Sequence, residues 1–168
     1  FIQGLNFGRP EAERQNAVLV EETKRFADAL DASLIIFHPG IDGYLTESIR
    51  QIQKFYDSRM AIENKPYRVV VNDLICLGNS SEEIQKIVEV CSVKFCLDIG
   101  HAICSANAHS INPFLFIKKF LALQPAMFHL TDGDFKGIYD QHLHFGVGSY
   151  PLQKILSLIP SNARITLE

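Results

Sequence analysis

Five short apolar runs in this chain each end on a side chain that can bind a metal ion. Short continuous apolar runs are typical of buried parallel strands. In a barrel of alternating strands and helices, the residues at the C-terminal ends of the strands converge on one point. The runs and their final residues are Leu34–Phe37 with His38, Met60–Ile62 with Glu63, Lys94–Leu97 with Asp98, Ala126–Phe128 with His129, and Arg164–Leu167 with Glu168.

Three further candidates lie in the connecting segments. His101 follows Asp98 by three residues, and Asp140 and His142 lie two apart, so they face the same side of an extended segment. Together with the strand ends this makes eight candidate ligands, whereas one ion needs three or four. The set therefore suffices for two or three ions. Mixed imidazole and carboxylate ligands suit Zn²⁺, Mn²⁺ or Fe²⁺. Clustered ions favour phosphoester hydrolysis, because they clamp the attacking and leaving oxygens together.

Each candidate taken alone has a simpler interpretation. A single histidine after an apolar strand is more often a hydrogen-bonded structural residue, and an aspartate there can cap a helix. A glutamate at the chain end can lie in solvent, and polar residues are ordinary in loops. His109 and His144 are not expected to be ligands. The joint pattern favours a ligand role for the eight candidates, most strongly for Glu63, Asp98, His129 and Glu168.

Strand-like and helix-like segments alternate along the chain, which predicts an α/β fold with a parallel sheet. The first strand is expected at Phe1–Phe7, and a helix at Glu11–Leu30 with Leu19, Phe26, Ala27 and Leu30 on one face. A loop is expected from Asp98 through His109, and another from Thr131 to Gly148. A second helix is predicted by the spacing of Leu45, Ile49, Ile52 and Tyr56. A capping box at Ser80–Glu83 and a cap at Asn112-Pro113 predict the starts of two more. Ser149 is expected to cap the last helix, in which Leu152, Ile155 and Leu156 face inward.

The spacing of the strand ends predicts the architecture. Successive candidates lie 25 to 39 residues apart, which is about one βα unit. Six strands are expected, so we predict one domain over residues 1–168, an incomplete (β/α)₈ barrel of about six βα units. A complete barrel needs ~250 residues, and at least ~200. The chain is therefore expected to lack its N-terminal strands and to self-associate through open sheet edges.

The composition is that of a globular protein. Of 168 residues, 47% are hydrophobic and 21% charged, and the net charge is −3. The overall residue counts show no excess of basic side chains of the kind that binds nucleic acid, although a local basic rim can exist on an acidic protein. The four cysteines lie in or beside apolar stretches without CxxC spacing, so we expect reduced core thiols of a cytoplasmic protein. No apolar run reaches transmembrane length, and no membrane partner is expected.

These motifs, in this order, resemble the xylose isomerase-like TIM-barrel superfamily, which includes endonuclease IV and the sugar isomerases and epimerases. The resemblance covers the chain from about Phe1 to Glu168. Each motif is short, and the ordered set carries the resemblance. The motifs are His38-Pro39-Gly40, Glu63-Asn64, Asp98-x-x-His101, Phe128-His129-Leu130-x-Asp132, Asp140-x-His142, Gly146-x-Gly148 and Leu167-Glu168.

The resemblance implies one of two metal sites. The epimerase type holds one divalent ion with Glu63, Asp98, His129 and Glu168, and its two glutamates exchange the substrate proton. The endonuclease IV type holds three zinc ions and adds His38, His101, Asp140 and His142. It also places a histidine just before the segment that resembles Phe1–Gly8, which is upstream of this sequence.

The first expectation is therefore a metal-dependent hydrolase that cleaves phosphodiester bonds at abasic DNA sites, with Glu63 and Glu168 as catalytic residues. Zinc is the expected ion, with manganese as the alternative, and no organic cofactor is expected. The loops look short for clasping a duplex, and basic residues are not concentrated in them. The alternative is a metal-dependent sugar or sugar-phosphate isomerase or epimerase. A third interpretation is a non-catalytic relic of the barrel that binds a ligand or partner.

Overall fold

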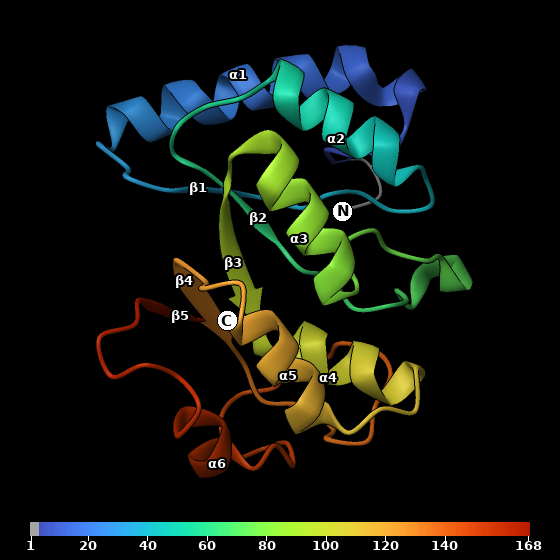
Figure 1. Cartoon of the computed structure of the whole chain (residues 1–168), viewed down its shortest axis with the longest axis vertical. Coiled ribbons are helices and arrows are strands. Elements are labelled where there is room, and N and C mark those ends of the chain that lie inside the picture. The colour runs from blue at the N-terminus through green and yellow to red at the C-terminus, as the bar shows by residue number, and fades with distance from the viewer. Residues whose placement is uncertain (1–3) are drawn as a thin grey trace.

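Five parallel strands form a single sheet in the computed structural model, which describes residues 4–168 (Figure 1). The strands follow each other in the sheet in the order in which they occur in the chain. This is the order of a (β/α)₈ barrel, and the strands form an open half-barrel. Their bounds are β1 Ile35–Phe37, β2 Met60–Glu63, β3 Lys94–Asp98, β4 Met127–Leu130 and β5 Ile165–Leu167.

Helices connect the strands and cover the sheet, which confirms the predicted α/β class. Figure 1 shows α1 to α3 gathered at one end of the molecule and α4 to α6 at the other. Short 3₁₀ turns lie at Pro10–Ala12 and Val71–Asp73. The helices are α1 Glu13–Ala29, α2 Leu45–Lys54, α3 Ser81–Cys91, α4 Ile99–Ala108, α5 Pro113–Leu121 and α6 Leu152–Leu156.

Two of the predicted caps are present. The Ser80 hydroxyl accepts a hydrogen bond from Glu83 N, and the Asn112 side chain accepts from the first backbone amides of α5. The Glu83 carboxylate does not complete the capping box, because it accepts from Gly78 N instead. Ser149 does not cap α6: its hydroxyl accepts from Phe135 N, and the residue before α6 is Pro151.

The first predicted strand is not observed. Residues 1–3 of the expected Phe1–Phe7 strand lie outside the described residues, and Gly4–Phe7 form no strand. The Asn6 N–H donates to Asn16 Oδ1 at 3.0 Å, so this donor is taken by a side chain of α1. The described residues therefore hold five strands, where six were expected.

The segment after Asp98 is a helix, so the predicted loop through His109 was wrong. The Asp98 side chain caps α4 by accepting from His101 N at 2.6 Å. Residues 99–106 of α4 are all buried. Burial against the sheet and α5 stabilises this helix.

Some expected helix faces are rotated. The buried residues of α1 are Asn16, Val20 and Ala27, whereas Phe26 is 68% and Leu30 63% exposed. Phe26 precedes Ala27 by one position, or about 100° around a helix, and so points away from the core. Tyr56 lies beyond the end of α2, and Leu156 is half-exposed.

All four cysteines are buried and free, as expected. No helix among the described residues is long and apolar enough to cross a membrane.

Candidate metal centre

The ends of the three central strands bring three of the predicted ligands together. Glu63, Asp98 and His129 are 3%, 1% and 6% exposed. Strand register places them side by side, since Asp98 pairs with His129 and Glu63 pairs with Cys96. Because the strands are parallel, all three side chains lie at the C-terminal edge of the sheet.

Glu63 lies at the centre of this group. Its carboxylate is 3.1 Å from His129 Nδ1 and 3.2 Å from His101 Nδ1. His38, which follows β1, approaches it with Nε2 at 3.5 Å from Oε2. His129 Nδ1 is also 2.9 Å from Glu168 Oε1, so it lies between two carboxylates.

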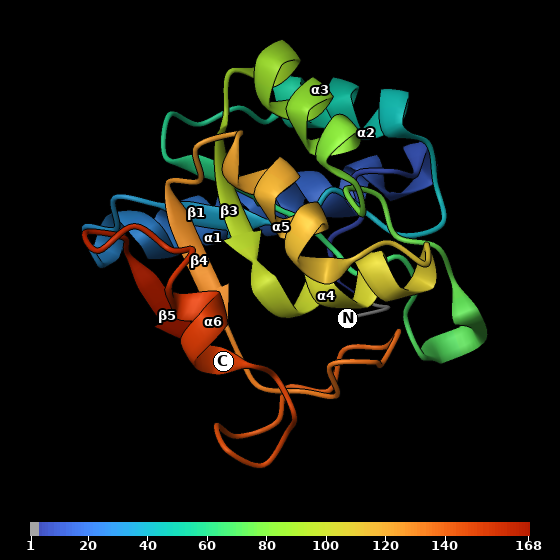
Figure 2. The same ribbon diagram turned by 60° about the horizontal axis from the view of Figure 1, so that its bottom comes forward.

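A second group is built from α4 and the loop after β4. His101 Nε2 is 3.3 Å from Asp140 Oδ2, and His142 Nε2 is 2.5 Å from the same oxygen. The loop that carries Asp140 and His142 extends beyond the helices in Figure 2. His142 Nδ1 also lies 3.7 Å from Glu168 Oε2, which connects this group with the first.

The tautomer of His101 determines which of its ring nitrogens can bind a metal ion. Its Nδ1 lies 2.8 Å from the Asn64 carbonyl oxygen. A carbonyl oxygen can only accept, so Nδ1 carries the proton in this hydrogen bond. Nε2 then faces Asp140 and His142, and it can bind a metal ion on that side once its own proton is displaced. A hydrogen bond from the other ring nitrogen is the usual support of a metal-binding histidine.

Burial and neighbouring charges act against each other in the cluster. Burial alone would raise the pKa of Glu63, but the facing imidazoles lower that pKa far below its usual range. Burial raises the pKa of Asp98 to about 6. Burial opposes charging of His101, yet the Asp98 carboxylate and other acidic neighbours raise its pKa to about 10. The carboxylates thus favour the protonated form of His101, and binding of a metal ion to this ring would displace a proton.

Three buried atoms of the cluster support occupancy by cations. Asp98 Oδ2, His129 Nδ1 and Asp140 Oδ1 have no hydrogen-bond partner of suitable geometry among the described residues. Such buried polar atoms are rare in folded proteins, and a bound ion is one reason for them. The donor types also fit Zn²⁺ or Mn²⁺. Four groups have donor atoms within 4.8 Å of one another: Glu63/Cys96/His129, His101/Asp140/His142, Glu63/Asp98/His101 and Asp98/His129/Glu168.

All eight sequence candidates therefore lie in or beside one cluster. His38 belongs to none of the four groups and contacts the cluster through Glu63. Cys96 was expected only as a core thiol, but its sulfur lies among the donor atoms. His109 packs against Tyr67, with ring centroids 4.4 Å apart. His144 is exposed.

Two supporting residues were not assigned roles from the sequence. The Asn64 side chain donates to Asp98 O at 2.9 Å and accepts from Asp98 N at 2.8 Å, which joins the ends of β2 and β3. Asp132 accepts from the amides of Gly133, Gly146, Gly148 and Tyr150, and so closes the loop that carries Asp140 and His142. Asn64 and Asp132 both belong to the sequence motifs, but their hydrogen-bond partners are seen only in the structure.

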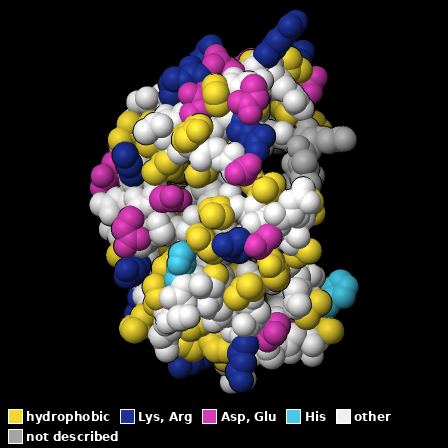
Figure 3. Space-filling model, turned by 90° about the vertical axis from the view of Figure 1, so that its right-hand side faces the viewer, with side chains coloured by type: hydrophobic (Ala, Val, Ile, Leu, Met, Phe, Trp, Pro, Cys, Tyr) yellow, Lys and Arg dark blue, Asp and Glu magenta, His cyan; other side chains and the backbone are white. Residues whose placement is uncertain are grey.

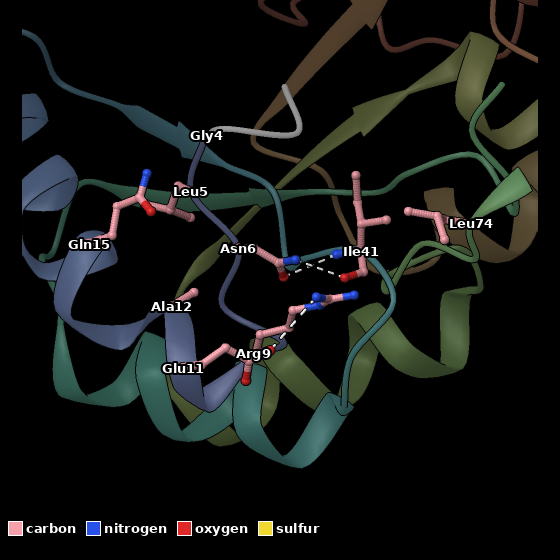
Figure 4. Close-up of a pocket in the computed structure, with 9 residues that line it drawn as sticks. All are labelled: Gly4, Leu5, Asn6, Arg9, Glu11, Ala12, Gln15, Ile41 and Leu74. Carbon is pink, nitrogen blue, oxygen red and sulfur yellow. Dashed lines mark hydrogen bonds and ion pairs between the residues drawn. The ribbon is translucent and has the colours of Figure 1, made fainter. Parts of the chain in front are cut away.

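The N-terminal segment holds the loop that carries His38. The Asn6 amide donates to Ile41 O at 2.8 Å and its oxygen accepts from Ile41 N at 3.2 Å (Figure 4). A cavity of about 290 Å³ lies beside this contact, away from the candidate ligands. Gly40 has φ of +140°, and a Cβ there would lie 2.5 Å from Asn6 Oδ1, so the close approach requires glycine.

Comparisons with known proteins agree with this architecture. The family model described as xylose isomerase-like TIM barrel matches residues 2–163. An uncharacterized protein of Methanocaldococcus jannaschii is 27% identical over 162 residues, which cover 88% of this chain and 59% of that protein. Endonuclease IV from Thermus thermophilus superposes with a TM-score of 0.73 at 19% identity, over 97% of this chain and 64% of that one.

A second structure, described as AsfvAP:AG, gives a TM-score of 0.65 at 14% identity, over 98% of this chain and 63% of that one. The chain thus spans about six tenths of the length of these proteins. At such low identities the structural matches establish the fold, while the family match covers nearly the whole sequence. The chain belongs to the xylose isomerase-like TIM-barrel family.

Proposed function

We propose that this chain carries the metal centre of an endonuclease IV-like phosphodiesterase that cleaves DNA at abasic sites. The observation that carries the proposal is the second donor group, His101, Asp140 and His142. One ion would be satisfied by the strand-end residues alone. A further complete set beside it favours a cluster of ions.

Divalent ions held by these residues would supply Lewis acidity at the phosphate and stabilise the leaving oxygen. The chain's own residues would position the reactants. Glu63 stays ionised because imidazoles surround it and lower its pKa, so it can hold cations and orient an attacking water. Glu168 is the more open of the two glutamates, with 31% of its side chain exposed, and can contact substrate.

Two other observations bear on the setting of this activity. Acidic and basic side chains are interspersed on the face shown in Figure 3, so this face offers no broad basic surface for DNA. Four free, buried cysteines favour a reducing compartment such as the cytoplasm.

Sugar isomerase or epimerase chemistry is the second candidate. It is favoured by one specific arrangement: Glu63 and Glu168 both lie within 3.1 Å of His129 Nδ1. Two carboxylates so placed around one ion site could act as an acid/base pair on a sugar. His101, Asp140 and His142 would then contact hydroxyl or phosphate groups of the substrate.

The test is cleavage of a duplex with one abasic site by the zinc-loaded protein. We expect incision at that site, no incision of the matched undamaged duplex, loss after chelation, and recovery with added zinc or manganese. His109→Ala should cleave normally, since His109 lies outside the cluster, whereas His101→Ala should not. Absence of incision together with metal-dependent isomerisation of a sugar would reject the proposal and favour the second candidate.

A further inference from the structure

The segment Asp140–His142 carries two candidate ligands in an unfavourable backbone conformation. His142 has a φ of +45°, in the left-handed region that residues other than glycine rarely adopt. Its side chain is 45% exposed, so packing alone does not hold the ring. A residue keeps such a conformation where contacts around it fix the chain. The positions of both ligands therefore depend on what holds the chain on either side of them.

Two contacts flank this segment. After it, Leu143 N donates to Asp132 O at 2.9 Å and Asp132 N donates to Leu143 O at 3.1 Å, which forms an antiparallel bridge. Before it, the Tyr139 hydroxyl donates to Asp73 Oδ1 at 3.1 Å. The first contact is made within the loop that follows β4, whereas the second is supplied by the segment that follows β2. The two ligands thus lie between an anchor in their own loop and an anchor in another.

The segment after β2 contains a short hairpin, residues 67–76. Its arms are Tyr67–Val69 and Leu74–Cys76, and two backbone hydrogen bonds of 3.0 and 3.1 Å join them. Its tip carries Asn72 and Asp73 with φ of +56° and +53°. Asparagine and aspartate tolerate this left-handed conformation better than most residues, so the sequence favours the tight tip. The hairpin therefore presents Asp73 from a defined backbone.

The base of the hairpin is joined to the segment that carries His38. The Ile75 carbonyl oxygen accepts from Asp42 N at 2.8 Å, and Leu77 N donates to Gly40 O at 2.9 Å. The hairpin is thus tied at its base to the segment after β1 and at its tip to the loop after β4. Figure 2 shows the turn at its tip beside that loop.

The Asp73 carboxylate is oriented by the hairpin itself. Arg68 contacts its Oδ2 at 2.5 Å and donates to the Asp73 carbonyl oxygen at 3.2 Å, while Oδ1 accepts from Tyr139. A cavity of about 250 Å³ is lined by Val69 of the hairpin and by Asp140 of the facing loop. Direct packing between the two segments is interrupted there, so the hydrogen bond between Tyr139 and Asp73 helps to set their spacing.

We propose that Asp73 is a positioning residue for the second donor group: through Tyr139 it holds Asp140 and His142 where they can share an ion with His101. This rests on the proposed function, because it assigns a bound ion to that group. Asp73 acts through Tyr139 and not on the ion itself. The affinity for the second ion then depends on the hairpin, whereas the affinity for the first depends on the strand ends.

The test measures the zinc affinity of each equivalent by competition with a coloured chelator. Tyr139→Phe removes one hydroxyl and keeps the ring. The second equivalent should bind about fivefold more weakly, the usual scale for losing one hydrogen bond, and the first should be unchanged. A general loss of stability would instead weaken both equivalents alike and lower the unfolding midpoint. Tyr56→Phe, between α2 and β2 at the opposite end of the strands, should change neither equivalent.

Variants of Asp73 test the same contact from its other side. Asp73→Ala should reproduce the effect of Tyr139→Phe. Asp73→Asn should keep most of the affinity, because its amide can donate to the Tyr139 hydroxyl oxygen. The double variant should be no weaker than Asp73→Ala, since both changes remove one contact. In the metal-free protein, amide hydrogen exchange over residues 139–143 should be faster in Tyr139→Phe than in the wild type.

Equal affinity for the second zinc in the wild type and Tyr139→Phe would overturn the positioning role, and so would additive losses in the double variant. A wild type that binds a single zinc would overturn it as well, whether or not DNA is cleaved. The DNA activity fails separately. If abasic DNA is not cleaved but binding of the second zinc still depends on Tyr139, the positioning role stands and the DNA activity does not.

Discussion

Glu63 connects most of the candidate centre. Three imidazoles lie within 3.5 Å of its carboxylate, and they come from the segment after β1, from α4 and from β4. A carboxylate so placed could hold cations or orient an attacking water, and either role needs its negative charge. Glu168 contacts His129 from the open side of the cluster, and its role also needs the negative charge of its carboxylate.

Neutralising either glutamate should therefore abolish turnover. Glu63→Gln and Glu168→Gln keep the side-chain size but remove the charge, and we expect loss of at least ~100-fold in rate. The assay is abasic-site incision under single-turnover conditions. Glu89→Gln on the exposed side of α3 is the matched control. Undiminished incision by Glu63→Gln would remove that residue from the reaction.

Asp132 shows how one side chain shapes a whole loop. It is 1% exposed, and its two oxygens accept four backbone hydrogen bonds from the loop and its ends. A side chain at Gly148 would meet Asp132 Oδ1 at 2.4 Å, so glycine permits this packing. The loop that Asp132 closes presents Asp140 and His142 to the second donor group.

Asp132→Asn should weaken both the fold and the second metal group. The amide has one acceptor oxygen in place of two, so two charge-assisted hydrogen bonds are lost, at a cost on the order of 3 kcal/mol. Urea unfolding and zinc titration measure the two effects. Asp134→Asn in the same loop is the control, because Asp134 is exposed. Zinc affinity equal to that of the wild type would show that the loop does not depend on Asp132.

Helices α1 and α2 are joined by charged groups. Arg50 on α2 contacts both Glu47 and Glu13, and Lys54 also contacts Glu13. Hydrogen bonding to Arg50 lowers the pKa of Glu47 to about 2. Since the unfolded pKa is about 4.3, the contact stabilises the fold above that pH, and the contribution is lost as pH falls toward 2.

Glu47→Gln should therefore reduce the acid sensitivity of the fold. The thermal midpoint of the variant should fall less steeply than that of the wild type between about pH 4.5 and pH 2. High salt should shrink the difference, because the groups are partly exposed. Glu22→Gln on the exposed face of α1 serves as control. Parallel pH profiles for wild type and Glu47→Gln would contradict this account.

Strand ends were the part of the site that sequence could predict. An apolar run fixes the strand, and parallel register then fixes where the next residue lies, as for Asp98 beside His129. The helix after Asp98 was missed because its stability comes from burial against other elements. Asp132 was missed because its hydrogen-bond partners lie in a loop whose path follows no periodic pattern.

The edges of the sheet are the main feature at the scale of the molecule. Within residues 4–168, β1 pairs only with β2, and β5 pairs only with β4. All three residues of β5 are exposed. Unpaired backbone groups along such an edge can pair with another chain. In a protein made of residues 1–168 alone, these two edges would be available for association.

This chain, studied as residues 1–168, should self-associate through those edges. Leu167→Lys places a charge on β5, where Leu167 is 64% exposed, and should shift the population toward monomer. Leu115→Lys on α5, where the side chain is 61% exposed, should not. Sedimentation velocity measures the difference. A stable wild-type monomer of 18.9 kDa with cooperative unfolding would show that the edges are protected.

The number of bound ions tests the central claim most directly. A cluster predicts more than one equivalent of zinc or manganese per protein chain after gel filtration, measured by elemental analysis. His142→Ala should lower that number by about one, because a site needs three or four protein ligands, and should leave the circular dichroism spectrum unchanged. His109→Ala should keep the full number. A single equivalent in the wild type, unaltered in His142→Ala, would contradict the endonuclease IV-like centre.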